Sequence, residues 1–126
     1  MIVTNELYGM ASTNDFHSAR VLQFDDATVE TVRKALTNAV QNRQEHFPIL
    51  IDSFGGSIYH LVSIVDMIQQ APLKVCTIIQ GCALSAAAIL GTMGTKGYRY
   101  AGPNATIMYH NIRGSAEGVV PLMKTK

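Results

Sequence analysis

Two stretches of the 126-residue sequence place glycines and hydroxyl side chains between an expected strand and an expected helix. The first is Asp52-Ser-Phe-Gly-Gly-Ser57, and the second is Gly81-Cys-Ala-Leu-Ser-Ala-Ala-Ala88. Paired glycines such as Gly55 and Gly56 allow a tight turn whose N–H groups no side chain covers. At the start of a helix such groups can hold an anion or a polarised carbonyl. The first stretch therefore predicts an oxyanion-binding turn or a plain turn, but not a phosphate-binding loop, because no Gly-Lys-Ser/Thr occurs.

Ser85 in the second stretch is a candidate nucleophile. A serine at the start of a helix is more often a cap for that helix. Here the small neighbours Ala83 and Ala86 would leave room for a substrate at the hydroxyl. The same logic underlies the nucleophile elbow, although Leu84-Ser85-Ala86 does not match its Gly-x-Ser-x-Gly pattern. A nucleophilic serine also needs a base, and histidine is the usual one.

Four histidines could supply that base. His110 ends an expected buried strand, at the end that a parallel strand would direct toward the same two turns. It could equally be a structural histidine. His60, after the Gly-Gly turn, is the weaker alternative, and His17 and His46 are expected to be solvated surface residues.

The elements that must position these residues follow from the apolar pattern. Strands are expected at 21–24, 48–52, 74–79, 98–101 and 105–110, with Gly81 ending the third. Helices are expected at 29–40, 57–70 and 84–93, with Asp26 as the N-cap of the first. Residues 1–19 are expected to form a loose arm. Strands that alternate with helices predict an α/β domain with a mostly parallel sheet and right-handed crossovers.

Composition excludes several classes of protein. The net charge is +1 without a basic cluster, which excludes a nucleic-acid surface. The two cysteines and four histidines show no disulfide or metal-ligand pattern, so we expect no metal and a reducing, cytoplasmic location. The run 75–95 carries no charge and is long enough to cross a bilayer. Its polar residues and glycines favour a buried strand, turn and helix, so no membrane contact is expected.

Five short motifs, in order along one stretch, together resemble a known family. They are Ile51-Asp-Ser-Phe-Gly-Gly-Ser57, Gly81-Cys-Ala-Leu-Ser-Ala-Ala87, Lys96-Gly97, Pro103-Asn104 and Met108-Tyr-His-Asn111. Between about 48 and 118 the sequence resembles the proteolytic subunit of the ATP-dependent Clp protease. The resemblance implies a crotonase-like spiral of ββα units, in which residues 1–126 form a single domain whose C-terminal part is missing.

The resemblance also implies the roles of the site residues. Ser85 would be the nucleophile and His110 the general base. The backbone N–H groups of Gly56 and Ala86 would form the oxyanion hole. Four residues are expected to bind substrate, the last three by pairing with an extended peptide as an added strand. They are Gly55, Asn111, Ile112 and Arg113.

Some positions depart from the pattern of the family. Asp52 stands in place of an asparagine, Phe54 in place of a proline and Cys82 in place of a glutamine, while Ala86 replaces a methionine. In the family an aspartate far downstream orients the histidine, and after His110 the only acid here is Glu117. Without an orienting carboxylate, the activity of such a site falls by about 10⁴-fold.

The leading hypothesis is a serine endopeptidase that cuts unfolded polypeptides inside a homo-oligomeric ring. It would need no cofactor of its own, because ATP would be used only by a partner AAA+ unfoldase. A non-catalytic subunit of the same architecture, which serves in assembly, is the alternative. A crotonase-like protein that binds an acyl-CoA is a third, and it is disfavoured because such enzymes need no serine nucleophile.

Overall fold

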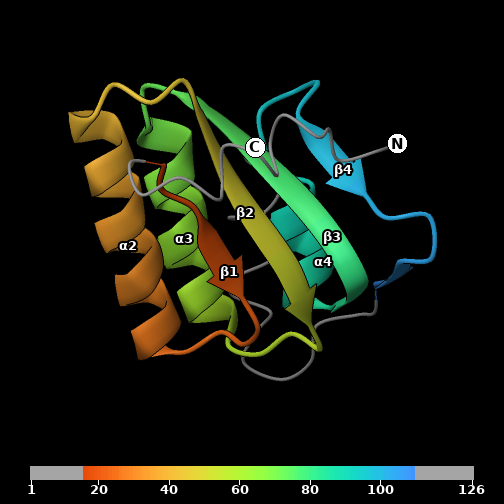
Figure 1. The fold of residues 1–126 in the computed structure, drawn as a ribbon. Helices are drawn as coiled ribbons and strands as arrows, with labels where there is room; N and C mark the ends of the chain where they lie inside the picture. The colour runs from red at the N-terminus through yellow and green to blue at the C-terminus, as the bar shows by residue number, and fades with distance from the viewer. Residues whose placement is uncertain (1–15, 110–126) are drawn as a thin grey trace.

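The computed structural model describes residues 16–109, which form a parallel sheet covered by helices (Figure 1). Four strands lie side by side in chain order: β1 (Ala19–Val21), β2 (His46–Ser53), β3 (Lys74–Leu84) and β4 (Arg99–Ala101). A fifth, β5 (Thr106–Met108), pairs with the end of β3, and every pair is parallel. The α/β class and the parallel sheet are confirmed.

Three helices join the strands: α2 (Asp26–Gln41), α3 (Ile58–Gln70) and α4 (Ala86–Gly91). Because the strand order equals the chain order, each crossover steps to the next strand in the same direction, and the chain winds as a spiral. Figure 1 shows α3 and α4 behind the strands, with α2 next to α3 at the left. The core lies between these layers, where Ile49, Ile51, Leu61 and Ile64 are fully buried.

The first strand and helix differ from their predicted bounds by a few residues. β1 covers Ala19–Val21 instead of 21–24, and only Phe24 forms an isolated bridge, to Gly56. Ala19, placed at the end of the predicted arm, therefore belongs to the sheet, whereas residues 1–15 lie outside the described residues. The N-cap of α2 is Asp25 and not Asp26, because the Asp25 carboxylate accepts a hydrogen bond from Thr28 N–H at 2.8 Å.

The third strand is longer than predicted. Gly81 was expected to end it, but β3 continues to Leu84. The register shows how: Ile51 faces Ile79, and Ser53 faces Ala83. One residue of β2 thus stands opposite three residues of β3, which is a β-bulge. The bulge lets β3 continue past the glycine, and it brings the chain to Ser85.

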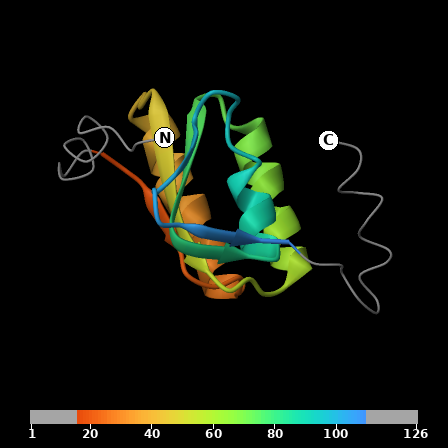
Figure 2. The same cartoon turned by 90° about the vertical axis from the view of Figure 1, so that its right-hand side faces the viewer.

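The edge of the sheet beyond β3 is formed by β4 and then β5, which follow one another alongside it (Figure 2). The strand leading to position 110 was expected to be buried, but this is wrong for its described part. All three residues of β5 are exposed, and so is Tyr109. Among the described residues β5 pairs with β3 on one side only, and it is an edge strand there.

The charge-free run 75–95 is divided between β3 and α4, as expected. Every residue of β3 from Val75 to Ile79 is buried. Between residues 16 and 109, no helix has the length and apolar content required to cross a bilayer. The run is therefore accounted for by a core strand and a short core helix.

Candidate active site

The three helices between residues 16 and 109 begin in two different ways. Asp25 and Ser57 precede α2 and α3 with extended backbones, and each side chain accepts a hydrogen bond from a backbone N–H of the first turn. Ser85 precedes α4 with φ 58° and ψ −119°, and its side chain makes no such bond. The reading of Ser85 as an ordinary helix cap is therefore not supported. Its hydroxyl is left available for another role.

The backbone of Ser85 is strained. A positive φ is uncommon for residues other than glycine and costs of order 1–3 kcal/mol in sparsely populated regions. The other described non-glycine residue with positive φ is Arg43, which follows the end of α2, where left-handed residues are common. Ser85 instead stands between a strand and a helix, as the nucleophile of a strained elbow does.

Neighbouring backbone groups hold this conformation. Ser85 N–H donates to the Met108 carbonyl at 2.9 Å, and the Ser85 carbonyl accepts from Ile89 N–H at 3.2 Å. The first bond ties the serine to the end of β5, and the second ties it to the first turn of α4. Since both backbone groups are used, the turn has a fixed orientation, and the side chain remains half-exposed.

Gly55 lies directly against this turn. A Cβ atom at Gly55 would come 2.7 Å from the Leu84 carbonyl oxygen, 3.1 Å from Ser85 Cβ and 3.4 Å from Ala86 N. Any side chain there would displace the serine, and Gly55 also has φ +101°. The structure thus brings together the Gly-Gly turn and the serine turn, which the sequence singled out separately.

The Gly-Gly turn is itself anchored at both ends. Gly55 N–H donates to Ser53 Oγ at 3.0 Å, and Ser53 is only 3% exposed. Gly56 forms its bridge to Phe24, and a Cβ on Gly56 would lie 3.1 Å from Phe24 Cβ. The ring of Phe54, in contrast, is 80% exposed. The turn is held by its backbone and buried hydroxyl, while the aromatic ring stays in solvent.

The predicted general base cannot be placed by the described residues. His110, with Asn111, Ile112 and Arg113, lies outside the described residues, so its predicted role as the base stays a prediction. Its neighbour Tyr109 is the last described residue, next to the Met108 that holds Ser85.

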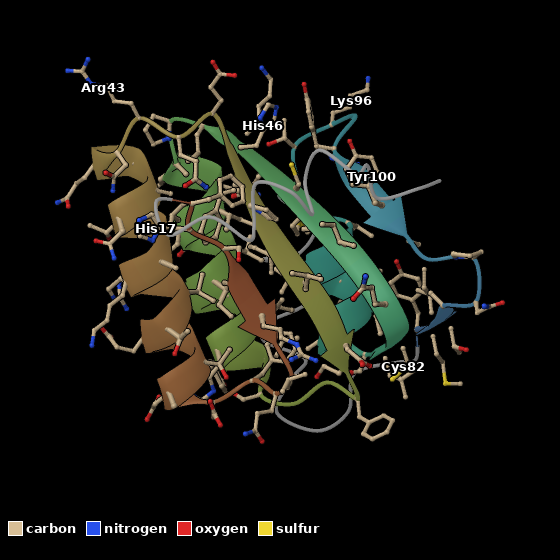
Figure 3. All side chains as sticks on the ribbon, viewed as in Figure 1. His17, Arg43, His46, Cys82, Lys96 and Tyr100 are labelled. Atoms are coloured by element: carbon tan, nitrogen blue, oxygen red, sulfur yellow. The ribbon has the colours of Figure 1, made fainter. Side chains whose placement is uncertain are left out.

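His60 was the alternative base, and the structure gives it another partner. Its Nε2 lies 2.7 Å from Asp26 Oδ1, at the start of α2. His46 lies at the other end of the sheet from Cys82 (Figure 3), and its ring packs on Tyr98 with centroids 5.4 Å apart. His17 donates its backbone N–H to Gln44 Oε1. His17 and His46 were predicted to be solvated surface residues, but both are half-buried.

One open hollow, of about 680 Å³, lies between α2 and α3 and is lined by none of the residues of the two turns. A smaller groove of about 290 Å³ runs between α4 and the edge strands, where Ala88, Ile107 and Tyr109 line it. Within residues 16–109, no three histidine, cysteine or acidic side chains gather as a metal site would require.

These observations define a class: an α/β protein with a serine on a strained strand-to-helix turn, packed against a glycine turn from the neighbouring strand. The comparisons with known proteins agree. A family profile described as Clp protease matches residues 14–125. The chain therefore belongs to the Clp protease family.

Two relatives show how much of such proteins the chain represents. The ATP-dependent Clp protease proteolytic subunit of Ligilactobacillus salivarius (strain UCC118) is 36% identical over 94 residues, which are 75% of this chain and 48% of the relative. The ATP-dependent Clp protease proteolytic subunit 1 of Leifsonia xyli subsp. xyli (strain CTCB07) is 33% identical over 102 residues, 81% of this chain and 52% of the relative. The chain spans about half the length of these curated relatives.

Proposed function

We propose that the protein is a serine endopeptidase that hydrolyses peptide bonds of unfolded polypeptides. The observation that carries this proposal is the Ser85 turn: a non-glycine residue at positive φ, whose hydroxyl does not cap the helix that follows and against which Gly55 packs. Backbone strain of this kind persists only where the surroundings enforce it, and it clusters at functional sites. Membership in the Clp protease family supports the same chemistry.

In the proposed mechanism, Ser85 Oγ attacks the carbonyl carbon of the scissile peptide bond while His110 accepts its proton. The backbone N–H groups of Gly56 and Ala86 donate to the oxyanion of the tetrahedral intermediate. Collapse of the intermediate breaks the C–N bond, and His110 returns the proton to the leaving amine. Water then hydrolyses the acyl-serine ester, with His110 again acting as base.

The observed hydrogen bonds narrow the choice of oxyanion donors. Ser85 N–H is already engaged by the Met108 carbonyl. A hydrogen bond to Met108 leaves the Ser85 N–H unavailable to a substrate carbonyl, which supports the next amide, that of Ala86, as the donor on the serine side. Ala86 would contribute only its backbone N–H, so its small side chain does not affect this role.

The proposal extends to partners by way of the relatives. Both are named as proteolytic subunits of an ATP-dependent protease. We propose a homo-oligomeric ring of this chain in the cytoplasm, served by an AAA+ unfoldase that consumes the ATP. The substrate would bind through Gly55 and the segment 111–113. No cofactor within this chain is needed for the steps above.

Cleavage of an unfolded, fluorescently labelled polypeptide by the full chain tests the proposal. Hydrolysis should disappear in Ser85→Ala and His110→Ala. Ser63→Ala is the matched control, because Ser63 is an exposed serine on α3 whose hydroxyl donates to the Tyr59 carbonyl at 3.3 Å. Absence of cleavage by an assembled sample of the unmodified chain would contradict the proposal and favour a non-catalytic subunit.

A further inference from the structure

Asp52 lies in β2, opposite the bulge in β3. It is the single β2 residue that stands opposite Gln80, Gly81 and Cys82, between the register pairs Ile51–Ile79 and Ser53–Ala83. Its side chain is on the exposed face of the sheet. Bulges re-aim the chain that follows them, and here the chain that follows is the path to Ser85.

Gly81 is needed for the carboxylate to fit. A Cβ on Gly81 would lie 2.7 Å from Asp52 Oδ1 and 3.0 Å from both Cγ and Oδ2. Gly81 also has φ +79°, a conformation that favours glycine. The carboxylate therefore lies directly over the backbone of the bulge, in space that any other residue at position 81 would fill.

The carboxylate bonds to the next residue of the bulge. Cys82 N–H donates to Asp52 Oδ1 at 3.2 Å, and the Cys82 thiol is 3.8 Å from the same oxygen. The thiol is also 3.8 Å from the Ser53 carbonyl oxygen. Partial desolvation and then the Asp52 charge raise the pKa of Cys82 above its usual value. The carboxylate is thus coupled to both the amide and the thiol of Cys82.

The segment beyond Cys82 is short and tightly paired. Ala83 is fully buried and faces Ser53 on one side and Ile107 on the other. Leu84 pairs with Met108, and its carbonyl meets Gly55. A shift of Cys82 would therefore also move Ala83 and Leu84, which contact the same strands as the serine turn. The result would be a displacement of the whole Ser85 turn.

We propose that Asp52 is a positioning residue for Ser85. Its carboxylate oxygen fixes the bulge through Cys82 N–H and thereby sets the direction in which β3 delivers the serine. Asp52 does not touch substrate in this scheme. The inference rests on the proposed function for its catalytic consequence, while the clamp itself is a property of the fold.

Two substitutions of Asp52 distinguish the effect of the position of its carboxylate oxygen from the effect of its charge. Asp52→Asn keeps an acceptor oxygen at the same place and removes the charge. Asp52→Glu keeps the charge and moves the oxygen by one methylene. Because residue 52 is exposed, both variants are expected to fold, and Asp52→Ala removes the acceptor altogether. Asp66→Ala, an exposed aspartate on α3, is the matched control.

The first readout is the rate at which a fluorophosphonate labels Ser85 in the full chain. Asp52→Asn should label within about twofold of the unmodified chain, whereas Asp52→Glu and Asp52→Ala should be slower by about tenfold to a hundredfold, as sub-ångström to ångström misplacements are. Asp66→Ala should label normally. Equal labelling rates for all variants would overturn the positioning role.

The second readout does not depend on catalysis. Amide hydrogen exchange at Cys82 should accelerate in Asp52→Ala and Asp52→Glu but not in Asp52→Asn, because only the latter keeps the acceptor. Alkylation of the Cys82 thiol near pH ~8 should also be faster in Asp52→Asn, since loss of the negative charge lowers the pKa of the thiol. If the unmodified chain is not labelled at all, the proposed function fails. In that case the exchange pattern still decides whether the clamp exists, and unchanged exchange in Asp52→Ala would overturn it.

Discussion

The backbone N–H of Ser85 donates a hydrogen bond to the carbonyl oxygen of Met108 at 2.9 Å. This bond joins the residue with the candidate nucleophile to the exposed edge strand that leads to His110. It also removes the Ser85 amide from the set of oxyanion donors. The edge strand is therefore part of the site, because it fixes the serine turn.

The strain at Ser85 predicts a trade between stability and function. Glycine adopts φ 58°, ψ −119° at much lower cost than alanine or serine. The free energy of unfolding of Ser85→Gly should therefore exceed that of Ser85→Ala by about 1 kcal/mol or more. Both variants lack the hydroxyl and should not react with a fluorophosphonate. Urea denaturation of the two variants is the measurement. Equal stabilities would show that the turn is not strained.

Contact between Gly55 and the serine turn predicts a severe effect of a single methyl group. Gly55→Ala should slow the labelling of Ser85 by about tenfold or more, because the new Cβ must push on the Leu84 carbonyl and on Ser85. Gly97→Ala is the control, since Gly97 has φ +90° with no heavy atom within 4 Å of an added Cβ. Gly97→Ala should lower stability through its backbone and leave labelling unchanged. If the two variants label alike, close packing at Gly55 does not matter.

The two candidate histidines are distinguished by their partners. His60 is occupied by Asp26, so His60→Ala should leave the labelling rate of Ser85 within about twofold, while it weakens the contact between the starts of α2 and α3. His110→Ala should reduce labelling by about 10³-fold or more, as loss of the base does in serine hydrolases. The rates come from timed reactions followed by mass spectrometry. The reverse order of effects would make His60 the base.

The cap of α2 predicts a dependence of stability on pH. The Thr28 N–H bond holds the pKa of Asp25 below its ordinary value of 3.8. A lowered pKa in the folded state means that the cap stabilises the fold above that value, and that its contribution is lost as the pH falls below 3.8 toward the folded pKa. Asp25→Ala should therefore lower the unfolding free energy at neutral pH, and this deficit should shrink as the pH falls below 3.8. Asp25→Asn keeps an acceptor, so its unfolding free energy at neutral pH should lie between those of the unmodified chain and Asp25→Ala. A loss of stability in Asp25→Ala that does not change with pH would contradict the role of the Asp25 carboxylate as the cap.

Much of this arrangement could be predicted from the sequence. Apolar periodicity indicated the parallel strands and the helices, and glycine with small residues marked both turns. Charge-free sequence from 75 to 95 was correctly assigned to a buried strand and helix. These features are local, because side-chain period and turn composition determine them within a few residues.

The features that the sequence analysis missed depend on contacts between distant segments. Gly81 was taken as the end of a strand, although an isolated glycine within a strand pattern can also mark a bulge. The bulge lies opposite Asp52, which is 30 residues before Cys82 in the chain and accepts a hydrogen bond from Cys82 N–H. Likewise, the role of the Met108 carbonyl follows from the register of β5 on β3 and leaves no mark in composition.

Exposure of the edge strand was also misjudged, for a physical reason. The run from Ala105 to Tyr109 alternates little and reads as a strand covered on both faces. In the structure β5 is paired with β3 on one side, and Ile107, Met108 and Tyr109 are 44%, 51% and 58% exposed. The hydrophobicity of a strand indicates that it tends to be covered, but it does not identify the segment that covers it.

Identification of the residue that a fluorophosphonate modifies is the most direct test of the proposed active site. The full chain, folded and assembled, is treated with the probe, digested and analysed by mass spectrometry, with Ser85→Ala and Ser63→Ala in parallel. We predict a single adduct on Ser85, retained in Ser63→Ala and absent from Ser85→Ala. An unlabelled folded chain, or an adduct on another serine, would contradict the assignment of Ser85 as the nucleophile.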